Sequence, residues 1–174
     1  MHVTLLTAAD VAPYRALMLE AYAMAPDAFT STPEERAAEP ESWWIKRLAD
    51  PSGQTVAFGA FDETGLVGTI ALEFSAKPKT RHKGHLIGMY VKPEARGTGA
   101  GRLLVERALV HAAERPGLRV LTLTVTQGNA PAELLYRSVG FKEFGVEPMA
   151  IRGSAGYLAK VHMWVEVQGG GTAA

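Results

Sequence analysis

The feature that most limits how this chain can fold is a glycine-rich turn between a strand and a helix. An apolar strand pattern ends at Val91, three glycines follow at Gly97, Gly99 and Gly101, and a helical apolar pattern then runs to Arg115. Glycine lets the backbone come close to a ligand and adopt positive φ. Unpaired N–H groups at a helix start, with the helix dipole behind them, attract anions. The turn therefore predicts a site for a phosphate or pyrophosphate.

Two common phosphate-binding motifs do not fit this turn. A P-loop ends in Gly-Lys-Ser/Thr, and no lysine stands at that place here. The dinucleotide fingerprint needs a glycine at its sixth position, where counting from Gly97 gives Arg102 and counting from Gly99 gives Leu104. What remains is Arg-x-x-Gly-x-Gly, which begins at Arg96. Taken alone, this pattern also fits a glycine-rich helix start that binds nothing.

A second block further along the chain narrows the interpretation. It reads Asn-x-x-Ala-x-x-Leu-Tyr-x-x-x-Gly-Phe from Asn129 to Phe141, and it follows the next strand pattern. In their order and separation the two blocks resemble the GNAT N-acetyltransferase superfamily, and together they span about residues 84–146. The resemblance implies the α/β (α+β) GNAT fold. In that fold, helices flank a twisted, mixed and mostly antiparallel sheet, which is splayed between its fourth and fifth strands.

The resemblance also implies acetyl-CoA as the co-substrate, bound in the splay. The backbone of Met89, Tyr90 and Val91 is expected to pair with the pantetheine arm, and a bulge there would aim an N–H at the thioester oxygen. Asn129 is expected to hydrogen-bond the pantetheine, and Tyr136 to lie near the sulfur. The pyrophosphate is expected on the glycine turn, which comprises Arg96, Gly97, Thr98, Gly99, Ala100, Gly101 and Arg102.

Direct attack of an amine on a thioester explains why such groups are needed. The attack creates an oxyanion, and one well-placed N–H donor is worth about 3 kcal/mol in other acyl-transfer enzymes. The leaving group is a thiolate, to which Tyr136 is the candidate catalytic donor. A core aromatic residue would also explain Tyr136, and a plain helix N-cap would also explain Asn129. The chain has no Cys and no evident Ser-His-Asp set, which favours direct transfer.

The general base is less clear from the sequence. In the N-terminal protein acetyltransferases of this superfamily, a Glu often stands five residues before the Asn, where this chain has Thr124. We take Glu73 as the candidate, because it alternates with apolar neighbours and so faces the other side of the sheet. His85, Glu147 and a water chain to solvent remain alternatives, and a solvated strand residue would also explain Glu73.

The rest of the chain predicts the remaining elements of one α/β domain. We expect Asp10 to cap the first helix, a lid loop over residues 26–31 with Phe29 as its apolar contact, and one buried residue in the pair Trp43 and Trp44. The expected strands are Val3–Leu6, Thr55–Phe61, Leu66–Phe74, His85–Val91, Val120–Thr126, Phe141–Val146 and Tyr157–Val167. Further helices are expected over residues 40–48, 101–115 and 129–139.

Composition limits the remaining classes. The length of 174 residues predicts one domain, over residues 1–167, with a flexible tail over residues 168–174. Eighteen basic and eighteen acidic side chains balance, which argues against a general nucleic-acid binder. We expect no membrane helix and a cytoplasmic location, because charges interrupt every long apolar stretch. The five His show no metal-ligand spacing, so we expect no metal.

These features together predict an acetyl-CoA-dependent N-acetyltransferase acting on a primary amine of a small molecule or peptide. A non-catalytic module that binds or senses acyl-CoA on the same fold is the alternative. A homodimer is possible through the last strand, where Val161, Met163 and Val165 alternate, although an internal strand would show the same pattern.

Overall fold

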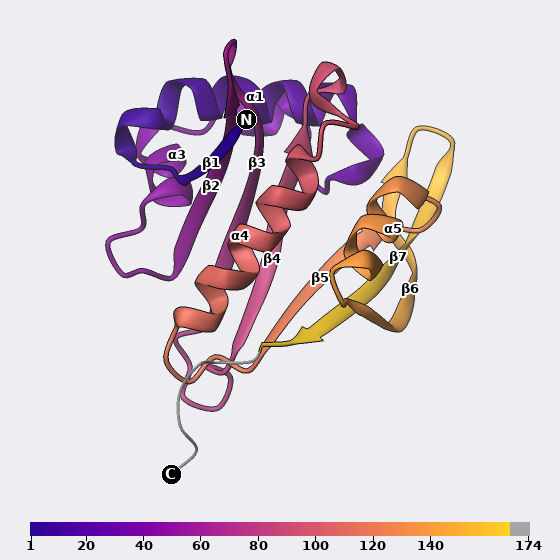
Figure 1. Cartoon of the computed structure of the whole chain (residues 1–174). Coiled ribbons are helices and arrows are strands. Elements are labelled where there is room, and N and C mark those ends of the chain that lie inside the picture. Colours follow the sequence, from indigo (N-terminus) through magenta and orange to yellow (C-terminus); the bar gives the residue numbers. More distant parts are fainter. Residues whose placement is uncertain (168–174) are drawn as a thin grey trace.

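A computed structural model describes residues 1–167, and the expected tail over residues 168–174 lies outside the described part. A seven-stranded sheet with helices on both faces makes up the molecule (Figure 1). The strands are β1 (His2–Leu5), β2 (Thr55–Asp62), β3 (Gly65–Phe74), β4 (Lys83–Val91), β5 (Val120–Thr126), β6 (Lys142–Gly153) and β7 (Gly156–Glu166). The helices are α1 (Val11–Met24), α2 (Pro33–Ala37), α3 (Glu41–Leu48), α4 (Ala100–Glu114) and α5 (Ala130–Ser138).

The sheet has the order β1-β2-β3-β4-β5-β7-β6. All neighbouring strands are antiparallel except β4 and β5, which are parallel. The expected mixed, mostly antiparallel sheet of the GNAT fold is therefore confirmed. No helix in the described range has both the length and the apolar character that crossing a bilayer requires.

The two parallel strands touch at one end and separate at the other. Their pairing is limited to Lys83 with Val120, Gly84 with Leu121, and His85 with Thr122. Beyond His85 the strands diverge, so that the sheet opens into a V (Figure 1). The splay expected between the fourth and fifth strands is confirmed, and along the rest of β4 the edge that faces β5 has no strand partner in the described chain.

Strand β4 also carries the expected bulge. Between the pairs Thr69–Tyr90 and Ala71–Ile87, the register advances two residues on β3 and three on β4. Gly88 lies in this interval with φ of 60°, a conformation that glycine adopts without strain. The bulge turns the backbone of Gly88 and Met89 out of the regular ladder, next to the open edge.

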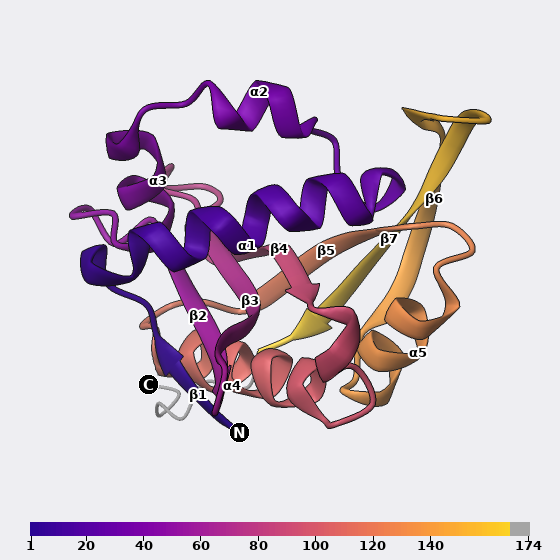
Figure 2. The same cartoon turned by 90° about the horizontal axis from the view of Figure 1, so that it is seen from above.

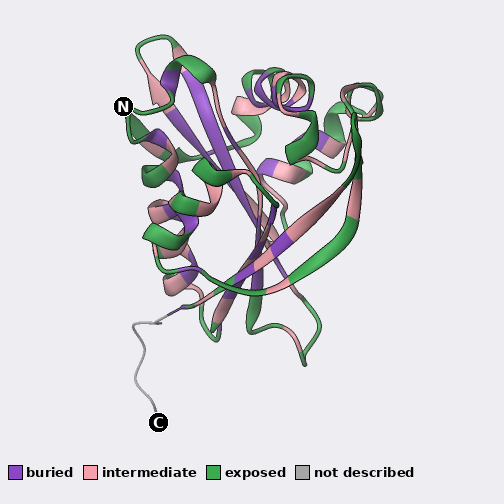
Figure 3. Ribbon diagram, turned by 90° about the vertical axis from the view of Figure 1, so that its right-hand side faces the viewer, coloured by how far each residue is buried: buried purple, intermediate pink, exposed green. Residues whose placement is uncertain are grey.

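Two hydrophobic cores cover the two faces of the sheet. One core packs α4 and α5 against inward residues of β3, β5 and β7. It includes Leu72 of β3, Leu104 of α4 and Leu121 of β5. The other packs α1 and α3 against the opposite face, and includes Tyr14, Trp44 and Leu48. Figure 2 shows α1, α2 and α3 on one side of the sheet and α4 on the other, and Figure 3 shows the buried residues concentrated where helices meet strands. Any opening through the sheet must therefore join the α1–α3 side to the α4–α5 side.

Two local details differ from the sequence-based expectations. Asp10 occupies the N-cap position of α1 but makes no side-chain cap there; instead it forms a capping box with Thr7 around a 3₁₀ helix over Ala8–Asp10. Strand β6 continues to Gly153, well beyond the expected end at Val146. Pro148 lies in the added stretch, and proline cannot donate to a ladder. The strand absorbs it in an irregular stretch between the pairs Glu147–Lys160 and Ile151–Leu158.

Candidate active site

A cleft of about 430 Å³ occupies the opening between β4 and β5. It is lined from the α4–α5 side by Asn129, Ala132 and Tyr136, and from the α1–α3 side by Tyr22, Phe29, Arg36 and Arg47 among others. Strand residues on both sides complete it: Glu73, His85, Leu86, Ile87, Gly88, Met89, Thr124, Val125, Thr126 and Lys160. The cleft therefore connects the two faces of the sheet, so that two ligands can meet in it from opposite sides.

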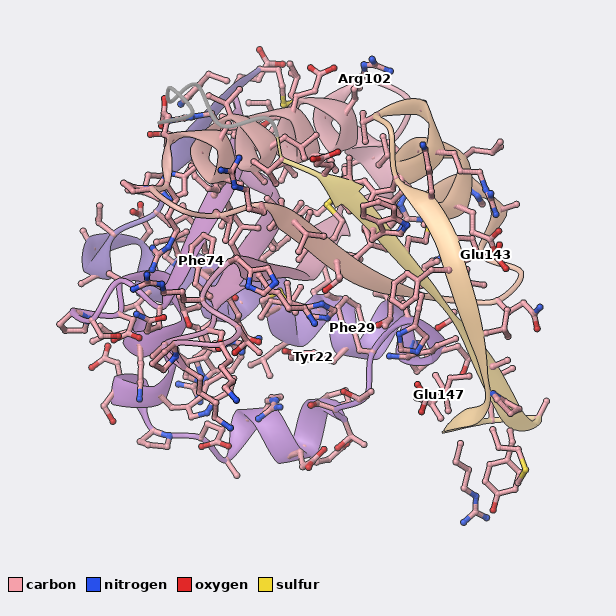
Figure 4. All side chains as sticks on the ribbon, turned by 90° about the horizontal axis from the view of Figure 1, so that it is seen from below. Tyr22, Phe29, Phe74, Arg102, Glu143 and Glu147 are labelled. Carbon is pink, nitrogen blue, oxygen red and sulfur yellow. The ribbon has the colours of Figure 1, made fainter. Side chains whose placement is uncertain are left out.

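The expected lid loop does line this cleft. Residues 28–31 form part of the wall, following a 3₁₀ helix over Pro26–Ala28. Phe29 packs edge-on against Tyr22, with ring centroids 5.1 Å apart, and Figure 4 shows the two side chains next to each other. The Asp27 carbonyl accepts a hydrogen bond of 2.6 Å from Thr126 Oγ1, which ties the loop to β5.

Of the residues expected to contact the pantetheine, Met89, Asn129 and Tyr136 line the cleft. Tyr90 and Val91 lie outside it. The Tyr90 side chain points to the α1 side, where its hydroxyl donates to Glu20 Oε1 at 3.1 Å. Because the expectation for Tyr90 and Val91 concerned their backbone, these side-chain positions leave it untested.

The glycine turn lies outside the cleft and presents backbone donors. Gly97 and Gly99 have φ of 76° and 91°, and a Cβ on either would meet nothing within 4 Å. In the described chain, no amide N–H from residue 97 to residue 102 has an acceptor, and the first helical bond runs from Leu103 N–H to the Gly99 carbonyl. The turn therefore offers a run of donors that suits an anion.

The charged and hydroxyl side chains of the turn are engaged locally. Arg96 Nε donates to the Val91 carbonyl at 3.1 Å, and Arg102 Nε donates to Glu106 Oε1 at 2.7 Å. Thr98 Oγ1 donates to the Ala95 carbonyl at 2.7 Å, which fixes the bend. Arg102 Nη1 also donates to Ser138 Oγ at 3.4 Å, and both arginines are exposed at the edge of the turn.

Asn129 and Tyr136 are positioned by helix α5. Asn129 Oδ1 accepts from the Ala132 N–H at 3.4 Å, so the side chain caps the helix as expected. Its Nδ2 group is a further donor, and the residue lines the cleft. The Tyr136 ring packs edge-on against Phe141 at 5.8 Å. Burial raises the pKa of Tyr136 well above its usual value, which keeps the hydroxyl protonated.

Two of the three candidate bases reach the cleft. Glu73 and His85 are cross-strand partners on β3 and β4, and both line the wall. Glu73 faces the side opposite Leu72 and Phe74, as the alternation predicted. Glu147 does not line the cleft; its Oε2 bonds His162 Nε2 at 2.9 Å, toward the β6–β7 hairpin (Figure 4).

The hydrogen bonds around Glu73 and His85 distinguish their roles. Glu73 Oε1 accepts from Arg47 Nη1 at 2.9 Å. His85 Nδ1 lies 2.8 Å from Thr122 Oγ1, which itself donates to the Gly84 carbonyl at 3.4 Å. In the tautomer in which Thr122 donates to Gly84, the Thr122 hydroxyl accepts from Nδ1–H and the lone pair of His85 is on Nε2. Burial lowers the pKa of His85, which favours the neutral imidazole at pH 7.

The cleft residues that the sequence analysis did not single out include Tyr22, Arg36, Arg47 and Lys160. They come from three helices and a strand that no local motif connects, so only the folded arrangement brings them together. Trp44 is fully buried, as expected for one residue of the Trp pair. Within residues 1–167, no group of three or more His, Asp or Glu side chains is arranged to hold a metal ion.

Comparison with known proteins places this arrangement in a family. Residues 17–141 match the family model described as "Acetyltransferase (GNAT) family". The mycothiol acetyltransferase of Thermobispora bispora is 31% identical over 80% of this chain and 45% of its own length. The peptidyl-lysine N-acetyltransferase YjaB of Escherichia coli is 41% identical over 35% of this chain and 37% of its own. The chain thus spans less than half the length of these curated relatives.

Solved structures share the fold over nearly the whole chain. A ribosomal-protein-alanine N-acetyltransferase from Brucella melitensis superposes with a TM-score of 0.79 at 26% identity, covering 95% of this chain and 99% of that one. A phosphinothricin acetyltransferase from Sinorhizobium meliloti, solved in complex with acetyl-CoA, has a TM-score of 0.82 at 22% identity. The match covers 99% of this chain and 91% of that one. Since the family model covers most of the chain, this protein belongs to the GNAT acetyltransferase family.

Proposed function

We propose that the protein is an N-acetyltransferase that moves the acetyl group of acetyl-CoA directly to a primary amine of a small molecule or peptide. The observation that supports this most is the position of Tyr136. It lies on the wall of the cleft that joins the β4 bulge, the α5 side and the α1–α3 side. The thioester and the amine would meet in this cleft, and the thiolate that leaves during the reaction needs a hydrogen-bond donor there.

Acetyl-CoA would enter from the α4–α5 side. The amides of residues 97–102, with Arg96 and Arg102 beside them, would hold the pyrophosphate. The unpartnered edge of β4 at Met89, Tyr90 and Val91 would pair with the pantetheine, as a further strand would. Asn129 Nδ2 would donate to the same arm while Oδ1 caps α5. The thioester would then lie between the bulge and Tyr136.

In the reaction, the amine nitrogen bonds to the thioester carbon and the C–S bond breaks. A bulge N–H stabilises the oxyanion, and one such donor is worth about 3 kcal/mol. The raised pKa of Tyr136 keeps its hydroxyl protonated, so it donates a hydrogen bond to the sulfur as negative charge develops. Coenzyme A leaves as the thiol once solvent supplies the proton.

The proton of the amine needs an acceptor, and His85 Nε2 suits this role better than Glu73. The His85 ring is fixed by Thr122, and its lowered pKa leaves it neutral and able to accept. The Glu73 carboxylate is bonded to Arg47, which occupies one of its oxygens. We therefore propose that Glu73 acts on His85, because its negative charge favours the imidazolium that forms.

A first experiment is thermal unfolding with excess acetyl-CoA, CoA, NAD or ATP. A ligand at about 100 times its Kd adds about 2.7 kcal/mol of stability. Stabilisation by acetyl-CoA and CoA alone, followed by acetylation of a member of a broad amine panel, is the expected result. Binding without turnover of any amine would instead favour the acyl-CoA-binding module, and an absence of binding would contradict both.

A further inference from the structure

The α1–α3 side of the cleft carries more positive than negative charge. Arg36, Arg47 and Lys160 line the cleft, whereas Glu73 is its one lining carboxylate among the described residues. We propose that the acceptor is a small amine that also carries a carboxylate, and that Arg36, assisted by Arg47, binds that carboxylate. This inference rests on the proposed function and names its acceptor class.

Both guanidinium groups lie against the same aromatic ring, that of Trp43. The Arg36 guanidinium carbon lies 4.6 Å from the Trp43 ring centroid, and that of Arg47 lies 5.3 Å from it. Such cation–π contacts hold a guanidinium in place without using its N–H donors. Both charges also act on Tyr22: burial raises the pKa of this hydroxyl, and Arg47 and Arg36 oppose that shift. Two like charges are thus held by one ring, and both residues line the cleft.

Neither guanidinium is saturated by the protein. Arg36 Nη1 donates to Glu39 at 3.4 Å, a long bond between partly exposed groups, and Arg36 Nε has no acceptor in the described chain. Arg47 Nη1 donates to Glu73 at 2.9 Å. Since each guanidinium has five N–H donors, most remain for a ligand. A carboxylate suits this arrangement, because it accepts two parallel bonds from one guanidinium.

The position of the pair separates it from the cofactor's phosphates. Arg36 and Arg47 belong to α2 and α3, on one side of the sheet, whereas the glycine turn leads into α4 on the other (Figure 2). Arg102 at that turn lies far from Tyr22 in Figure 4. An anion bound by the Arg36–Arg47 pair would therefore belong to a second ligand that enters from the α1–α3 side.

The cleft also has a place for the amine of the same molecule. Arg47 shares the Trp43 ring with Arg36 and donates to Glu73, and Glu73 stands opposite His85. A zwitterion could place its carboxylate at Arg36 and its ammonium at Glu73, where His85 removes the proton. Lys160 on the facing strand adds positive charge; burial lowers its pKa, and no carboxylate within residues 1–167 lies within ion-pair distance of its Nζ.

The test compares α-amino acids with their carboxamides, which keep the amine and lose the negative charge. The amine of the amide is less basic, so ionisation of the amine alone would favour the amide. We expect kcat/KM to be at least tenfold higher for the best acid than for its amide. In Arg36→Gln, the KM for that acid should rise about tenfold or more, while the values for its amide and for acetyl-CoA stay within twofold.

Arg119→Gln is the matched control, because this exposed arginine lies just before β5 and outside the cleft. Arg119→Gln should have the same KM and kcat/KM as the unaltered protein, both for the acid and for its amide. Equal turnover of acids and amides would overturn the inference and leave the acetyltransferase proposal standing. If no amine is acetylated although acetyl-CoA binds, the proposed function fails. Calorimetric titration of the acids and amides into the CoA complex then decides, and acids that bind no more tightly than amides overturn the inference.

Discussion

Glu73 and His85 face each other across the β3–β4 ladder, and each is held by a different element of the fold. Arg47 of α3 holds Glu73 at 2.9 Å, and Thr122 of β5 lies 2.8 Å from His85 Nδ1. The imidazole is therefore fixed at the point where β4 and β5 begin to separate. The negative charge of Glu73 favours the imidazolium and so opposes the lowering of the His85 pKa by burial, which links the charge of Glu73 to the protonation of His85.

This link predicts the pH dependence of kcat/KM. In the proposed mechanism activity needs the neutral imidazole, so it should be present above the pKa of His85 and be lost as the pH falls through that pKa, which burial holds below its ordinary value of 6.5. Glu73→Gln removes the charge that favours the imidazolium, so the acidic limb should move to lower pH. A pH profile from pH 4.5 to about 9 with a saturating donor would measure the shift.

The control for this titration is Glu147→Gln. Glu147 has a side-chain exposure of 54%, close to the 44% of Glu73, but it bonds His162 outside the cleft. Its loss should leave the acidic limb in place. Loss of all activity in Glu73→Gln, with His85→Gln still active, would instead make Glu73 the base.

Tyr136→Phe tests the donor to the leaving group. Removing the hydroxyl removes a hydrogen bond to the developing thiolate, so kcat should fall by about a hundredfold, as when one donor to an oxyanion is lost. The ring still packs against Phe141, so the melting temperature and the Kd for CoA should change little. Stopped-flow or steady-state rates together with calorimetric binding would separate the two effects. An unchanged kcat would remove Tyr136 from the mechanism.

Gly99→Ala tests the anion site at the turn. With φ of 91°, an L-residue at this position is strained by about 1–2 kcal/mol. We expect weaker binding of CoA, because relief of the strain reorients the amides of residues 97–102. Gly117→Ala is matched: its φ is 77°, and its Cβ would also meet nothing within 4 Å. This variant should lose similar stability yet bind CoA normally, and equal CoA binding by both variants would contradict the assignment.

Gly84→Ala tests the point where β4 and β5 join. A Cβ there would lie 2.6 Å from Leu121 Cδ2 and 3.2 Å from Phe74 Cδ1. Such overpacking costs about 1–3 kcal/mol, which lowers the melting temperature by several degrees in a domain of this size. The double variant with Leu121→Val should be more stable than the sum of the single effects, measured by chemical unfolding. Strict additivity would mean that the two side chains do not meet.

Much of the fold was predictable because local patterns carry it. The glycine turn, the Asn129 cap and the alternation of Glu73 with Leu72 and Phe74 each depend on neighbours in sequence, and the strands and helices lie near their expected bounds. The length of β6 was not predictable, since Pro148 interrupts the pattern and the partner strand decides whether pairing resumes.

On the α4–α5 side, the sequence motifs singled out Asn129 and Tyr136, which line the cleft, whereas the residues on the α1–α3 side belong to no local motif. Arg36 and Arg47 acquire significance only because Trp43 holds both against the cleft. Likewise, Glu147 lost its candidacy through its bond to His162, a contact set by the register of β6 on β7. Such contacts between distant segments leave no local trace in the sequence.

The short parallel contact between β4 and β5 has a consequence for how the molecule responds to ligands. Within the sheet, three residue pairs connect strands β1–β4 to strands β5–β7. The two parts of the sheet are therefore paired over a short length only. A pantetheine arm bonded to β4 on one side and Asn129 on the other would span the gap far from those three pairs. A ligand in the cleft would then restrict the movement of the two parts of the sheet relative to each other. We expect the backbone amides of both parts to exchange hydrogen as one cooperative unit when the ligand is bound, rather than as two independent units.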